Sequence, residues 1–148
     1  INDRWTAIQS FPTERVHGIS FVINGKGYVG TGLINWNIPL QSDLYEYDPM
    51  TNSWTKKASI PGVGRYAAVG FTMNGKGYIG TGERINPTGR LGDIWEYNAF
   101  NDSWIEYTTH PSGGVHYARQ FTINNVVFIG GGSYGWGSDF YKFSNNLN

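Results

Sequence analysis

The residues NGKGYVGTG at positions 24–32 recur, with a single change, as NGKGYIGTG at positions 74–82. A third version, NNVVFIGGG, occupies positions 124–132. Aromatic residues on either side keep the same spacing: Phe21, Phe71 and Phe121 in one set, and Trp54 and Trp104 in another. The chain therefore uses one unit of about fifty residues nearly three times, and its aromatic and turn residues favour short β-strands.

Each repeat is expected to contain four strands. The Asn-Gly pairs at 24–25 and 74–75 tolerate the positive φ angles of a two-residue hairpin turn, and Asn124-Asn125 is a weaker form of that signal. The predicted strands are 17–23, 67–73 and 117–123, then 26–32, 76–82 and 126–132, then 43–47, 93–97 and 139–143, and finally segments around Trp54 and Trp104. Repeats of this length are typical of a β-propeller, so we predict an all-β fold with three four-stranded blades.

The third strand of each repeat carries an aromatic face. Side chains alternate along a strand, so Tyr45 shares a face with Tyr47, and Trp95 shares one with Tyr97. A single binding site need not recur in every repeat, whereas residues that build a blade must. We therefore expect these aromatic side chains to pack between neighbouring blades.

The third repeat ends before the tryptophan of its fourth strand, while Asn2-Asp3-Arg4-Trp5 resembles Asn101-Asp102-Ser103-Trp104. We expect repeats over 6–54, 55–104 and 105–148, with residues 1–5 supplying the outer strand of the last blade. Propellers have about 4 to 8 blades, so three are too few. Two hypotheses stay open: a homodimer that forms a six-bladed ring, or a fragment of a longer single-chain propeller.

Composition excludes several classes of protein. The formal net charge is zero and no basic stripe is present, so we do not expect a nucleic-acid partner. The chain has no cysteine, which rules out disulfides and thiolate metal sites, and no apolar stretch is long enough to span a membrane. Three histidines without a convergent carboxylate set predict neither metal nor cofactor. The Tyr-, Asn- and Trp-rich composition favours an extracytoplasmic protein.

The repeats resemble the kelch family, and specifically the kelch propellers of exported bacterial proteins. The resemblance rests on Gly-Thr-Gly or Gly-Gly-Gly after the second strand, on Tyr47 seven residues before Trp54, and on the same spacing from Tyr97 to Trp104. Thr31 and Thr81 depart from the usual adjacent glycines. Kelch propellers include binding scaffolds and some enzymes, so the resemblance implies a fold more than an activity.

Two arginines are candidates for ligand binding. Arg15 and Arg65 stand at the start of the innermost strands, and Val115 takes their place in the third repeat. A guanidinium suits bidentate contact with a carboxylate, and the resemblance implies that an arginine here grips acidic or hydroxylated ligands. The alternative is an arginine that ties down a loop between blades through backbone carbonyls.

The longer connections, 33–42, 83–92 and 133–138, carry the other candidates, because loops on a rigid scaffold commonly hold functional residues. Trp36, Tyr134 and Trp136 are large aromatic residues that do not recur in register. Arg84 and Arg90 lie in the second of these connections, and His116 lies near the expected channel mouth. We interpret these six residues as ligand contacts.

Two functions fit these residues, and a purely structural spacer is a third. The first is a non-catalytic binding or scaffold propeller that recognises a glycan or a protein through the loop face around the channel, with no catalytic residues. The alternative is a sugar epimerase or mutarotase with its site at the channel mouth, for which Glu14, Arg15 and His116 offer material. A polar pocket at that mouth would favour the enzyme.

Overall fold

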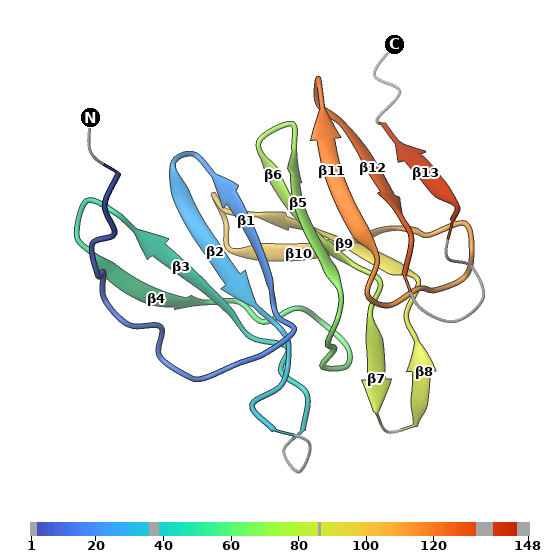
Figure 1. The fold of residues 1–148 in the computed structure, drawn as a ribbon, viewed down its shortest axis with the longest axis horizontal. Coiled ribbons are helices and arrows are strands. Elements are labelled where there is room, and N and C mark those ends of the chain that lie inside the picture. Colours follow the sequence, from blue (N-terminus) through green and yellow to red (C-terminus); the bar gives the residue numbers. More distant parts are fainter. Residues whose placement is uncertain (1–2, 36–38, 86, 133–137, 145–148) are drawn as a thin grey trace.

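In a computed structural model, residues 3–35, 39–85, 87–132 and 138–144 are described. These residues form thirteen strands and no helix, so the all-β prediction is confirmed. No helix in this part of the chain could cross a membrane. Three antiparallel sheets lie side by side in one row (Figure 1).

We call the sheets blades and number them along the chain. The first blade has the order β1-β2-β3-β4, and the second has the order β10-β9-β6-β5. The third blade contains β11-β12-β13 among the described residues. The bounds are β1 Ile19–Ile23, β2 Lys26–Gly30, β3 Leu44–Asp48, β4 Ser53–Lys57, β5 Val69–Met73, β6 Lys76–Gly80, β9 Asp93–Asn98, β10 Ser103–Thr109, β11 Arg119–Ile123, β12 Val126–Gly130 and β13 Phe140–Phe143. Each predicted strand appears, with bounds shifted by a few residues.

The hairpin turns behave as their sequence predicts. Asn24 and Gly25 both adopt positive φ angles, 50° and 77°, and the two asparagines of the third repeat do the same. This left-handed geometry matches the twist of the paired strands. Consequently β1 pairs with β2 so that Phe21 lies opposite Tyr28.

A short hairpin in the second repeat was not predicted. The connection 83–92 contains β7 Glu83–Ile85 and β8 Thr88–Arg90, which pair so that Glu83 lies opposite Arg90. The hairpin projects from one end of the second blade (Figure 1). Its two strands have three residues each and show no clear alternation of apolar and polar residues, so strand periodicity does not reveal the hairpin.

Apolar cores fill the spaces between blades. The core between the first two blades includes Phe21, Leu44, Ile79 and Tyr97, all buried. The ring of Phe21 occupies the space where a side chain on Gly77 would stand. The core between the second and third blades includes Phe71, with Phe143 packed against it. The expected packing of the aromatic third strand is confirmed at Tyr97, and Phe143, on the third strand of the last repeat, packs against the second core.

The N-terminal segment does not complete the third blade of its own chain. Residues 3–10 form no strand, Trp5 is fully exposed, and this segment and β13 lie on opposite sides of the row of blades (Figure 1). Instead, the segment lies along β4, where Trp54 Nε1 donates a hydrogen bond to the Gln9 carbonyl at 2.9 Å. A strand exchanged between chains stays a prediction.

Candidate functional site

Arg15 and Arg65 both hold a carboxylate of their own blade. In the second blade, Arg65 donates from Nη1 to Oδ1 of Asp93 at 2.8 Å and from Nη2 to Oδ2 at 2.7 Å. Arg65 Nη1 also reaches the Thr81 carbonyl at 3.2 Å. Arg15 repeats the arrangement with Asp43 and the Thr31 carbonyl. This geometry favours the loop-tying alternative over the ligand-binding one.

The third blade lacks this ion pair. Val115 stands in the place of the arginines, and among the described residues Asp139 has no ion-pair partner. A cavity of about 10 Å³, enough for one water molecule, lies beside Val115, Asp139 and the buried His110. The three blades therefore share their strand arrangement, but only the first two have the arginine–aspartate ion pair.

The loop candidates divide into two groups. Trp36, Tyr134 and Trp136 lie outside the described residues. Arg84 is half-buried on β7, with Gly89 opposite it, and does not line the pocket described next. Arg90 and His116 both line that pocket, and their role as ligand contacts stays a prediction.

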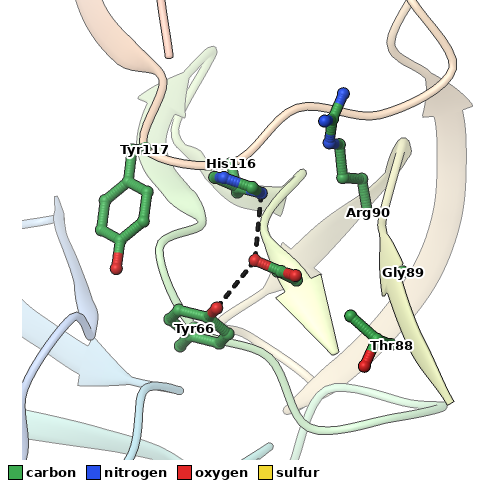
Figure 2. Close-up of a pocket in the computed structure, with 7 residues that line it drawn as sticks. Tyr66, Thr88, Gly89, Arg90, His116 and Tyr117 are labelled. Atoms are coloured by element: carbon green, nitrogen blue, oxygen red, sulfur yellow. Dashed lines mark hydrogen bonds and ion pairs between the residues drawn. The ribbon is translucent and has the colours of Figure 1, made fainter. Parts of the chain in front are cut away.

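A pocket of about 510 Å³ opens beside the β7–β8 hairpin (Figure 2). The residues that line it are Tyr66, Glu83, Thr88, Gly89, Arg90, His116 and Tyr117. Its size suits a small-molecule ligand, and its lining combines aromatic rings with a few charged groups, as ligand sites commonly do. Arg90 approaches from β8, across the pocket from Tyr66 and Tyr117 (Figure 2).

Local pairing fixes the backbone of Glu83, one of the residues that line the pocket. The amide of Tyr66 donates to the Glu83 carbonyl at 3.1 Å, and the amide of Glu83 donates back to Tyr66 at 3.0 Å. This bridge joins the entrance of β5 to the start of β7. It fixes the backbone on which the carboxylate stands.

The Glu83 carboxylate has two partners in the pocket. The Tyr66 hydroxyl donates to Oε2 at 2.7 Å, and His116 Nδ1 lies 3.1 Å from the same oxygen (Figure 2). Among the described residues, no hydrogen bond reaches Oε1. A carboxylate and an imidazole at this distance form an ion pair when the imidazole is protonated.

Burial and the hydrogen bond to Glu83 together raise the pKa of the Tyr66 hydroxyl above its ordinary value. The hydroxyl therefore stays protonated at neutral pH and acts as a donor to Glu83. Tyr117 packs edge-on against His116, with ring centroids 5.3 Å apart, and closes one side of the pocket.

Glu83 was missed by the sequence reasoning, which named Glu14 as the acidic candidate. A signal was available, since Glu83 directly follows the repeated Gly-Thr-Gly at the position of Leu33. A charged residue in place of a buried leucine marks a departure from the blade pattern. Among the described residues, no group of three or more His, Asp or Glu side chains could hold a metal ion.

No family model matches the chain, so the kelch resemblance rests on the repeats and the fold. The chain is similar to the N-acetylneuraminate epimerases of Salmonella typhi, 43% identical over 65 residues, and of Salmonella enteritidis, 42% identical over 65 residues. These matches span 40% of this chain and 17% of each relative.

The fold is similar to the solved structure of YjhT, a β-propeller, with a TM-score of 0.77 and 20% identity. The superposition covers 97% of this chain and 56% of that one. The chain therefore has the fold of part of a β-propeller. Its curated relatives carry the name of a sugar-processing enzyme, which favours the epimerase alternative over the non-catalytic one.

Proposed function

We propose that this protein binds a sugar acid in the pocket around Glu83 and interconverts its ring forms, as an epimerase of the mutarotase type. The observation that carries the proposal is the contact of Glu83 with both Tyr66 and His116 inside a 510 Å³ pocket. The names of the curated relatives, N-acetylneuraminate epimerases, supply the substrate class.

The reaction needs an acid and a base on one substrate. In ring opening, a base takes the proton of the anomeric hydroxyl, the bond from the anomeric carbon to the ring oxygen breaks, and an acid protonates that oxygen. Ring opening turns the anomeric carbon into a carbonyl carbon. The ring then closes on the other face of this carbonyl by the reverse steps, which gives the other anomer and returns both protons. Glu83 takes the first proton, and protonated His116 supplies the second.

The remaining lining residues orient the substrate. Arg90 is exposed at the rim and offers a guanidinium to the substrate carboxylate. The rings of Tyr66 and Tyr117, with centroids 6.1 Å apart, offer apolar surface to the sugar. Arg15 and Arg65 hold the frame through Asp43 and Asp93.

In this proposal the three blades of the chain are part of a complete propeller, and the pocket lies within that complete ring of blades. The likeness to 56% of a propeller chain supports it, and the missing blades come from a second copy or from the rest of a longer chain. An extracytoplasmic location also stays a proposal, resting on composition alone.

Proton NMR of N-acetylneuraminate tests the activity, because the two anomers give separate signals whose exchange rate is measurable. The protein is expected to speed exchange, and Glu83→Gln is expected to slow it by about 100-fold or more, as loss of a general base does. Glu106→Gln, an exposed carboxylate on β10, is the matched control and should leave the rate unchanged. Equal rates for Glu83→Gln and the unaltered protein would overturn the proposal.

A non-catalytic glycan-binding module is the second candidate. The His116 side chain is only 6% exposed, which limits its access to a substrate. If the protein binds N-acetylneuraminate but does not change the rate of exchange between its anomers, this function is supported. Arg90→Met should then weaken binding of the sugar acid. Arg4→Met, on the exposed N-terminal segment, should leave binding unchanged.

A further inference from the structure

Three two-residue hairpin turns lie at one end of the blades, opposite to the end from which the β7–β8 hairpin projects (Figure 1). Their first residues have φ angles of 50°, 52° and 48°, and their second residues have φ angles of 77°, 70° and 62°. The backbone of the turn is thus the same in each blade. The sequences differ at the second residue, which is glycine at 25 and 75 and asparagine at 125.

Asn125 of the third blade holds the turn of the second blade. Its side-chain nitrogen Nδ2 donates a hydrogen bond to Oδ1 of Asn74. Its own Oδ1 accepts the main-chain amide of Asn74 at 3.0 Å. One asparagine side chain therefore fixes both the side chain and the backbone of Asn74, the first residue of the neighbouring turn.

Asn24, at the same position in the first blade, has no such partner. The second blade packs on the first as the third packs on the second, but Gly75 stands where the third blade has Asn125. Among the described residues, no hydrogen bond reaches the Asn24 side chain. Asn24 and Asn74 are both exposed, so the bonds from the next blade are what distinguishes them.

An asparagine followed by glycine can react within the chain in water. The glycine amide nitrogen loses its proton and attacks Cγ of the asparagine, so a new carbon–nitrogen bond forms. The bond from Cγ to the side-chain nitrogen breaks, and that nitrogen takes up a proton and leaves as ammonia. Water then opens the resulting succinimide ring at either carbonyl, which gives aspartate or isoaspartate. Glycine favours the attack because no side chain crowds its nitrogen.

This reaction requires the asparagine side chain to rotate until Cγ lies over the next nitrogen, and it requires new backbone angles. At Asn74, the rotation breaks the hydrogen bond from Asn125 Nδ2, and the bond to the main-chain amide resists the change in backbone. At Asn24, neither bond exists. The fold therefore slows the reaction at one Asn-Gly pair and leaves the other free to react.

We propose that Asn24 is a site of spontaneous deamidation, and that Asn125 protects Asn74 from the same reaction. Both products at Asn24 carry a negative charge, and isoaspartate also adds one carbon to the main chain of a two-residue turn. β1 and β2 pair Ile23 with Lys26 across this turn, a register that the longer chain cannot keep. Because Ile23 is buried between the first two blades, the isoaspartate form should unfold at a lower temperature.

Mass spectrometry of tryptic peptides tests the proposal on the folded protein, incubated in mildly alkaline buffer. Trypsin releases one peptide for each site, residues 16–26 and residues 66–76, and both peptides end in Asn-Gly-Lys. Asn24 should deamidate about tenfold faster than Asn74, the difference that two exposed hydrogen bonds impose on a rate. In urea, where the local sequence alone decides, the two rates should be nearly equal.

Two substitutions exchange the neighbours of the two sites. Gly75→Asn supplies Asn24 with the missing partner and should slow its reaction by about tenfold. There is room for it, since a Cβ on Gly75 meets no atom within 4 Å. Gly75→Ala, without an amide, is the matched control and should leave Asn24 unchanged. Asn125→Gly should speed the reaction of Asn74 by about tenfold, whereas Asn124→Gly, in the same turn, should not change it.

If Asn24 reacts no faster than Asn74 in the folded protein, the proposal is overturned, whether both residues react or neither does. The same ratio of rates in the folded and the unfolded protein would overturn it too, because local sequence would then be the cause. So would a rate that the exchange of neighbours leaves unchanged. Circular dichroism checks that each variant is folded, and one folded exchange is enough, since both test the same pair of bonds.

Discussion

The guanidinium of Arg65 and the carboxylate of Asp93 meet through two parallel hydrogen bonds of 2.8 and 2.7 Å, and the Arg65 side chain is 1% exposed. The pair joins the start of β9 to the segment that leads into β5. Since Arg15 and Asp43 repeat it, this contact belongs to the blade and not to one binding event.

Arg65→Met should therefore destabilise the fold. Removing one partner leaves Asp93 in a largely buried position without its counter-charge, which costs about 3–5 kcal/mol. Urea unfolding measures the loss. Arg90→Met, which removes an exposed guanidinium, should change the free energy of unfolding by less than about 0.5 kcal/mol.

The same pair predicts a loss of stability in acid. Burial acts to raise the pKa of Asp93, but the hydrogen bonds and charge of Arg65 outweigh it and hold that pKa below its ordinary value. The folded state therefore binds this proton less readily than the unfolded state. The stabilisation is complete above about pH 5 and is lost as the pH falls through the native pKa.

Unfolding free energies between about pH 2 and pH 6 measure this slope. Asp93→Asn should have a lower stability at pH 6 and a shallower slope. An unchanged slope in that variant would assign the acid sensitivity to other carboxylates.

Asp139→Asn should be nearly neutral. Asp139 is exposed and, with Val115 in place of the arginine, has no ion-pair partner among the described residues. The substitution should change the free energy of unfolding by about 0.5 kcal/mol or less, whereas Asp93→Asn leaves a buried guanidinium unpaired. Comparable losses in both variants would show that Asp139 has a structural partner.

Tyr97→Phe should cost about 1–3 kcal/mol. The buried Tyr97 hydroxyl donates to Oδ1 of Asp102 at 2.7 Å, and the same oxygen accepts the Ala58 amide at 2.9 Å. Hydrogen bonds to a charged group are worth about this much. Tyr45→Phe is the control, because its hydroxyl has no hydrogen bond to a described residue; thermal and urea unfolding compare the two.

Repetition explains what could be predicted from the sequence. The strands, the Asn-Gly turns and the packing of Tyr97 recur at a fixed spacing, so each copy supports the others. Arg15 and Arg65 were named from the repeat, but their partners Asp43 and Asp93 were not. Asp43 and Asp93 follow them by the same 28 residues, and this shared spacing was the available signal.

The pocket could be predicted only in part, because its residues break the repeat. Arg90 was named for its place in the connection 83–92 and His116 for lying near the expected channel mouth, and both line the pocket. Glu83 was not named, since its place beside His116 depends on a three-residue strand and a bridge to Tyr66. Such contacts follow from the approach of two segments in space, which local sequence does not encode.

Residues 17, 67 and 117 hold the same left-handed backbone, with φ angles of 55°, 52° and 56°, yet carry an imidazole, a methyl group and a phenol. Main-chain hydrogen bonds join these positions, and the rings of His17 and Tyr117 also meet edge-on with centroids 5.3 Å apart. The backbone contacts are the same for three different side chains, so this frame tolerates diversity at these positions. A combinatorial library randomised at these three positions would place different side chains next to one another while keeping the same backbone. The chain is therefore a practical starting point for engineered receptors.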